Sequence, residues 1–121
     1  MKITEVIAEA DRLMPNQYST EQKIQWLSRL DAMIFNEMIR THACAPMEPP
    51  SYESEGDELL VEFPYGNDIY VYYLQAKIAA ENFETAKYNQ FMELYNDAYL
   101  RWASWFNARF MPRRAYPRFI W

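Results

Sequence analysis

The sequence is poor in the residues that cross-link a chain or let it turn tightly. It contains two glycines, Gly56 and Gly66, and one cysteine, Cys44. A phosphate-binding loop needs several closely spaced glycines, so this chain has no such loop. One cysteine excludes an intramolecular disulfide bond. The fold must therefore depend on packing, as is usual for proteins of a reducing compartment.

Long hydrophobic runs are also missing. The longest one, residues 69–74, is far shorter than the ~20 apolar residues needed to span a bilayer. Residues 1–3 are followed by acidic residues rather than by the apolar core of a signal peptide. The sequence therefore predicts no membrane role and no export.

No arrangement typical of a catalytic or metal site is present. The single histidine, His42, lies beside Cys44, but a metal site needs three or four ligands and a nucleophilic cysteine needs an orienting third group. The acids around residues 53–58 lack the glycine and ligand spacing of a calcium-binding EF-hand, which favours a solvated acidic loop. We expect no enzyme, no cofactor and no bound metal.

Residues 68–110 contain no glycine or proline and hold most of the aromatic residues, so we expect helix throughout with one break. The break is predicted at residues 82–85, where Asn82 can adopt the left-handed C-terminal conformation and Thr85 can cap the next helix. An unbroken helix would measure ~60 Å, too long for a small domain to cover. At helical spacing, one apolar face combines Ile69, Tyr72, Tyr73, Ala76, Ala79, Ala80 and Phe83, and the other combines Tyr88, Phe91, Met92, Tyr95, Ala98, Tyr99, Trp102, Phe106 and Phe110.

Two further helices are expected before this hairpin. Thr4 is the predicted N-cap of the first, which ends before Pro15. Ser19 and Gln22 fit a capping box that starts the second, which ends near His42. The fold class is therefore all-α: a small bundle of about four helices within a domain of residues 1–111.

Asp31 falls at or near the apolar face of the second helix, where an unpaired carboxylate is costly. We expect it to accept hydrogen bonds from a helix start or from an arginine. A catalytic acid is the less favoured interpretation, because no second carboxylate or histidine is placed to work with it.

A long connection, residues 43–67, joins the second and third helices. It contains four prolines and no lysine or arginine, and its second half, residues 58–63, favours a short strand or extended segment. Asn67 or Asp68 is the predicted N-cap of the third helix. The acids expected to contact a partner are Glu48, Glu53, Glu55, Asp57 and Glu58.

Charge is divided unevenly along the chain. All 17 acidic residues precede residue 98, whereas five of the 12 basic residues follow it, in a chain of formal net charge -5. Residues 112–121 form a predicted extended arm for an acidic partner. The alternative is that the arm folds back and covers Trp102 and Trp105. The expected contact residues are Arg109, Arg113, Arg114, Tyr116, Arg118, Phe119 and Trp121.

Several strings resemble those of a family of small proteins encoded in the head-to-tail morphogenesis region of tailed phages and prophages of Gram-positive bacteria. The resemblance covers about residues 4–107, and members tend to carry Asn-Gly where this chain has Asn82-Phe83. The matching strings are residues 15–18, 23–28 with Leu30-Asp31, Pro64-Tyr65, residues 68–74, Tyr88-Asn89 and residues 95–99.

The resemblance implies a head-tail connector, or adaptor, in the virion neck. Such a protein forms a ring, usually a dodecamer, on the portal protein, contacts tail and head-completion proteins, and resides in the host cytoplasm during assembly. The alternative function is a nucleic-acid-binding or DNA-packaging accessory protein that uses the Arg and aromatic residues of the arm. The net negative charge weighs against that alternative.

Overall fold

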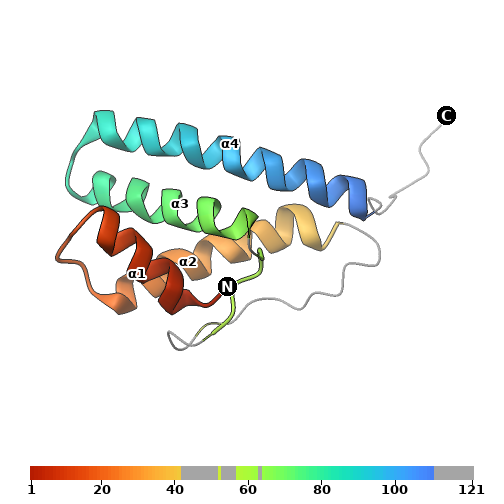
Figure 1. Cartoon of the computed structure of the whole chain (residues 1–121), viewed down its shortest axis with the longest axis horizontal. Helices are drawn as coiled ribbons and strands as arrows, with labels where there is room; N and C mark the ends of the chain where they lie inside the picture. The colour runs from red at the N-terminus through yellow and green to blue at the C-terminus, as the bar shows by residue number, and fades with distance from the viewer. Residues whose placement is uncertain (42–51, 53–56, 63, 111–121) are drawn as a thin grey trace.

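Figure 1 presents the computed structural model, which describes residues 1–41, 52, 57–62 and 64–110. The helices are α1 (Ile3–Leu13), α2 (Thr20–Ile34), α3 (Tyr65–Glu81) and α4 (Thr85–Arg109), and α2 continues into a π-helical segment, η1 (Phe35–Ile39). No strand occurs among the described residues. The predicted all-α bundle of four helices is confirmed.

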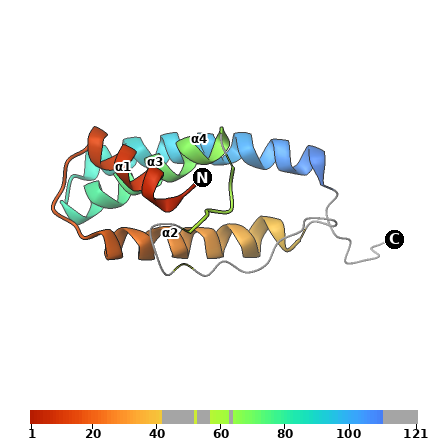
Figure 2. The same ribbon diagram turned by 60° about the horizontal axis from the view of Figure 1, so that its bottom comes forward.

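Helix α3 is the centre of the bundle. It lies between α4 on one side and α1 and α2 on the other, as the two views in Figures 1 and 2 agree. Because it has neighbours on opposite sides, it buries Tyr70, Val71, Leu74 and Ile78, which lie outside the single face predicted for it. Ala80, which was predicted on that face, is exposed. Burying each such side chain fully contributes about 1.5 to 3 kcal/mol.

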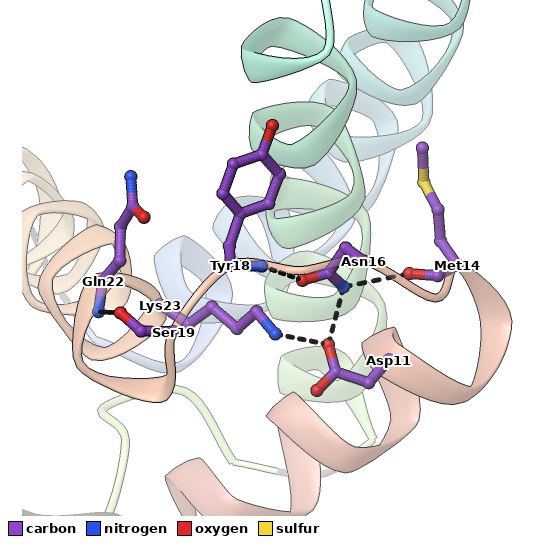
Figure 3. Close-up of polar contacts among 7 residues, drawn as sticks. All are labelled: Asp11, Met14, Asn16, Tyr18, Ser19, Gln22 and Lys23. Carbon is purple, nitrogen blue, oxygen red and sulfur yellow. Dashed lines mark hydrogen bonds and ion pairs between the residues drawn. The ribbon is translucent and has the colours of Figure 1, made fainter.

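The turn between α1 and α2 is held by side chains (Figure 3). The Asn16 amide donates to an Asp11 carboxylate oxygen at 2.9 Å and to the Met14 carbonyl at 3.0 Å, and its own oxygen accepts from the Tyr18 backbone N–H at 3.1 Å. The Lys23 ammonium, on a side chain only 3% exposed, lies 2.7 Å from the same Asp11 oxygen. These contacts fix the angle at which the chain leaves α1 and enters α2.

The predicted helix starts are right for α2 and wrong for α1 and α3. Ser19 Oγ accepts a hydrogen bond from the Gln22 backbone N–H at 3.2 Å, as expected of an N-cap. Helix α1 begins at Ile3, not after Thr4, because Glu5 accepts from the Lys2 backbone N–H at 2.8 Å.

Helix α3 begins at Tyr65, ahead of both predicted caps, Asn67 and Asp68. The cause is Gly66, whose backbone N–H donates to the Glu62 carbonyl at 2.9 Å. A Cβ at this glycine would lie 2.3 Å from the Val61 carbonyl oxygen, so only a residue without a side chain lets the helix begin here.

The hairpin between α3 and α4 turns where it was predicted, but with different residues in the key positions. Phe83, rather than Asn82, has the left-handed conformation, with φ 59°. Asn82 instead accepts a hydrogen bond from the Tyr18 hydroxyl at 2.5 Å. Glu84, rather than Thr85, precedes the first residue of α4. Phe83 is 91% exposed, so its predicted place on the buried face is also wrong.

Residues 57–62 attach to the N-terminus of the chain. Ile3 N–H donates to the Asp57 carbonyl at 3.1 Å, and Leu59 N–H donates to the Met1 carbonyl at 2.8 Å. These bonds form one isolated antiparallel bridge, between Lys2 and Glu58, instead of the short strand considered for this segment. Leu59 is 3% exposed, so the segment closes one side of the core.

Candidate functional site

Asp31 is the buried hub of a polar cluster that joins three parts of the chain. Its carboxylate accepts hydrogen bonds from the Tyr70 hydroxyl of α3 at 2.6 Å, from the Leu60 backbone N–H at 3.0 Å and from the Tyr52 hydroxyl. The Tyr70 hydroxyl in turn accepts from the Val61 N–H at 2.9 Å. The prediction that Asp31 accepts hydrogen bonds is confirmed, but the predicted partners, a helix start or an arginine, are wrong.

Burial governs the electrostatics of this cluster. Burial raises the pKa of Asp31 above its ordinary value. The hydrogen bonds from Tyr52, Tyr70 and Leu60 reduce the size of that rise without reversing it. Burial and the nearby Asp31 charge raise the pKa of Tyr70 well above the ordinary phenol value. Asp31 and Tyr70 are both 0% exposed, so a substrate has no path to either group. The arrangement suits a structural role, in which hydrogen bonds to Asp31 and Tyr70 hold Tyr52, Leu60 and Val61 of the connection against the bundle.

A second cluster lies on the surface, where the start of α3 meets the second half of α4. The rings of Tyr65 and Trp105 lie 5.6 Å apart between centroids, and Trp105 is 42% exposed. The Arg109 guanidinium lies 5.9 Å from the centroids of both Trp105 and Phe110. A hollow of about 170 Å³ adjoins Tyr65. We call this surface the Trp105 patch, and it consists of Pro64, Tyr65, Asp68, Ala98, Arg101, Trp105 and Arg109.

A row of aromatic rings runs along α4, and Arg109 of the Trp105 patch lies 5.9 Å from the ring centroid of its last member, Phe110. Successive centroids along the buried side of α4 are 4.7 to 6.0 Å apart, which suits tilted and edge-to-face ring contacts. Trp102 belongs to this row and is 3% exposed, whereas Trp105 lies out of phase with it and faces outward. The row comprises Tyr73, Tyr95, Tyr99, Trp102, Phe106 and Phe110.

Four of the predicted contact or structural residues have defined places besides Asp31 and Ser19. Arg109 and Asp68 both belong to the Trp105 patch, Asp68 in the first turn of α3 and not as its cap. Asp57 holds Ile3 through its carbonyl, and the exposed Glu58 carboxylate lies 3.1 Å from the amino group of Met1. The remaining predicted contact residues lie outside the described residues: Glu48, Glu53, Glu55, Arg113, Arg114, Tyr116, Arg118, Phe119 and Trp121.

Sequence reasoning did not identify Tyr65 and Trp105 as neighbours on the surface. A signal existed for Trp105, since it precedes Phe106 directly and falls outside the spacing that relates residues 95, 99, 102 and 106. Tyr65 gave none, because its place depends on the early start of α3 that Gly66 allows.

Comparison of the chain with protein-family models, curated proteins and solved structures found no match. The resemblance to phage connector proteins therefore rests on the strings of the sequence itself.

Within residues 1–41, 52, 57–62 and 64–110, no group of three or more His, Cys, Asp or Glu side chains is placed to hold a metal ion. None of the helices there combines the length and apolar character needed to cross a membrane.

Proposed function

We propose that the protein is a non-enzymatic structural component of a tailed-phage neck: a head-tail connector that forms a ring on the portal protein and allows the tail to attach. Two lines of reasoning support this. One is the resemblance of about residues 4–107 to connector proteins. The other, which carries the proposal physically, is the Trp105 patch.

The composition of the Trp105 patch favours binding of a protein. Tryptophan, tyrosine and arginine are the residues that most often dominate the binding energy of protein interfaces. Here Trp105 lies beside both Tyr65 and Arg109; Trp105 and Arg109 are exposed and Tyr65 is half-buried. The contacts of Trp105 with Tyr65 and Arg109 restrict these side chains before a partner binds, so less side-chain entropy is lost on binding.

The position of the patch suits an adaptor. Arg109 ends α4, and the basic residues 112–121 follow almost at once. An interface that combined the patch with these residues would join a preformed anchor to a positively charged segment. The acidic residues of the connection provide a complementary charge on each neighbouring copy in a ring.

Leu100 of α4 is also exposed, at 63%, but it lies outside the Trp105 patch. Its replacement therefore serves as a control for the removal of an exposed apolar side chain.

Removal of the gene from the phage or prophage that carries it tests the proposal. A connector is needed after packaging, so the mutant should accumulate DNA cut to mature length together with separate, unattached tails. Plasmid-borne wild-type protein and the control Leu100→Ala should restore infectious particles, whereas Trp105→Ala should reduce the titre at least about tenfold, as expected for loss of about 1.4 kcal/mol of binding.

Two outcomes would contradict the proposal. An unchanged titre in the deletion mutant would exclude an essential neck component. Accumulation of uncut DNA would instead indicate a role in packaging, the nucleic-acid-binding alternative.

A further inference from the structure

Phe83, at the tip of the α3–α4 hairpin, combines an exposed aromatic side chain with an unfavourable backbone conformation. Its φ is 59°, in the left-handed region that residues other than glycine rarely adopt, and its side chain is 91% exposed. Glycine would adopt this backbone conformation without strain, and a polar residue would be more favourable in contact with water. Neither folding nor solubility favours a phenylalanine here, so we infer that its side chain contacts another molecule.

The tip also carries negative charge. Glu81, the last residue of α3, is exposed, and Glu84 follows Phe83 directly, with Lys87 3.0 Å from its carboxylate. The phenylalanine ring is therefore flanked by two carboxylates within the same turn. Its binding partner should offer an apolar hollow bordered by positive groups.

The Trp105 patch has those properties. Its hollow of about 170 Å³ is lined by Pro64, Tyr65 and Ala98, with Asp68 and Arg101 also at its wall, and Arg101 pairs with Asp97. Arg109 lies beside it, over Trp105. Figure 1 shows that the hairpin tip and the end of α4 lie at opposite ends of the long axis, so the chain cannot place Phe83 in its own hollow.

We propose that Phe83 of one copy inserts into the hollow of the Trp105 patch of a second copy, with Glu81 and Glu84 facing Arg101 and Arg109. This inference deepens the proposed function and rests on it, because it assigns the contact that would build the ring. Two different surfaces meet, so the contact is head-to-tail and each copy can bind two neighbours. Such a contact closes into a ring or grows into a chain.

The contact is small and should be weak in solution. One inserted ring and two charge pairs bury much less than the 1,200 Å² or so of a stable interface. Dissociation constants of about 10 µM to 1 mM are expected, with higher apparent affinity once a ring closes or a portal gathers the subunits.

Mixing of two variants tests the contact with purified full-length protein. Phe83→Gly removes the inserted ring and leaves the patch, and Trp105→Ala impairs the patch and leaves the tip. Sedimentation velocity should show growth beyond dimers for wild type at rising concentration, and monomers for each variant alone. A mixture of the two variants should give dimers that do not grow, because one intact contact remains. The control Leu100→Ala should associate as wild type does.

Several results would overturn the proposal: wild-type protein that stays monomeric to about 1 mM, a Phe83→Gly variant that associates like wild type, or a mixture without dimers. Dimers of Trp105→Ala alone would indicate that two hairpin tips meet each other. If Trp105→Ala does not fold, the exposed Arg109→Glu takes its place. Failure of this experiment is distinct from failure of the proposed function, which is decided by phage particles and not by self-association.

Discussion

Replacement of Asp31 by alanine should destabilise the fold strongly. The substitution removes the acceptor of two donors, the Tyr70 hydroxyl and the Leu60 N–H. Both donors point at the Asp31 carboxylate, which is 0% exposed. Each buried unpaired donor costs about 1 to 3 kcal/mol, and relief of the carboxylate's own burial offsets part of that cost. A net loss of about 2 to 4 kcal/mol in the free energy of unfolding is expected.

Chemical denaturation at neutral pH measures this loss, with Asp97→Ala as the matched control. Asp97 is exposed and pairs with Arg101 one turn along α4, and an exposed pair of this kind contributes less than about 0.5 kcal/mol. If Asp31→Ala unfolds within about 0.5 kcal/mol of wild type, the cluster does not hold the connection and the reasoning is refuted.

Wild type and Asp31→Ala should differ more in unfolding free energy at low pH than at high pH. Burial raises the pKa of Asp31 in the folded protein above its value in the unfolded chain, so the folded state takes up a proton first. This contribution to stability is fully present below about pH 4 and is lost as pH rises through the folded pKa. The difference in unfolding free energy between wild type and Asp31→Ala should therefore be larger near pH 4 than near pH 8.

Three further predictions address the fold. Gly66→Ala should lower the unfolding free energy by about 2 kcal/mol or more in denaturant titrations, despite the better helix propensity of alanine, because the new Cβ would lie 2.3 Å from the Val61 carbonyl oxygen; an unchanged midpoint would contradict the early start of α3. Phe83→Gly should raise the unfolding free energy by about 0.5 to 1 kcal/mol and Tm by a few degrees, and a lower Tm would show that the ring supports the hairpin. Burial raises the pKa of Tyr99 to about 12 and raises that of Tyr70 well above the ordinary phenol value, so stability should fall as pH rises from about 10, where unfolded tyrosines ionise, toward 12; phenolate absorbance that completes its change near pH 10 in the folded protein would contradict this.

The helices were predictable because they depend on local sequence. The absence of glycine and proline from residues 68–110 fixed the α3–α4 hairpin, and Ser19 with its neighbours fixed the start of α2. A break in this stretch followed from the length of helix that a small domain can cover, and its position followed from Asn82 and Thr85 as a predicted helix end and helix start. Which residue takes the left-handed conformation did not follow from the local sequence: Phe83 takes it, and the Asn82 side chain accepts a hydrogen bond from the distant Tyr18.

The site was less predictable because its contacts join residues far apart in the chain. Burial of Asp31 was expected from helical spacing, but nothing local indicates that its partners are Tyr52, Leu60 and Tyr70. The Trp105 patch likewise depends on the helix start that Gly66 allows. The contact residues chosen for charge fall largely outside the described residues, which leaves Arg109 as the one that both lines of reasoning share.

The most direct test of the central claim is cryo-electron microscopy of necks from the phage or prophage particles that carry this gene, with the chain identified by a bound antibody fragment. A head-tail connector should appear as a closed ring of identical helical subunits between the portal and the tail, with each subunit in contact with its neighbours. Necks in which no ring density fits the bundle of α1 to α4, and to which the antibody fragment does not bind, would contradict the account.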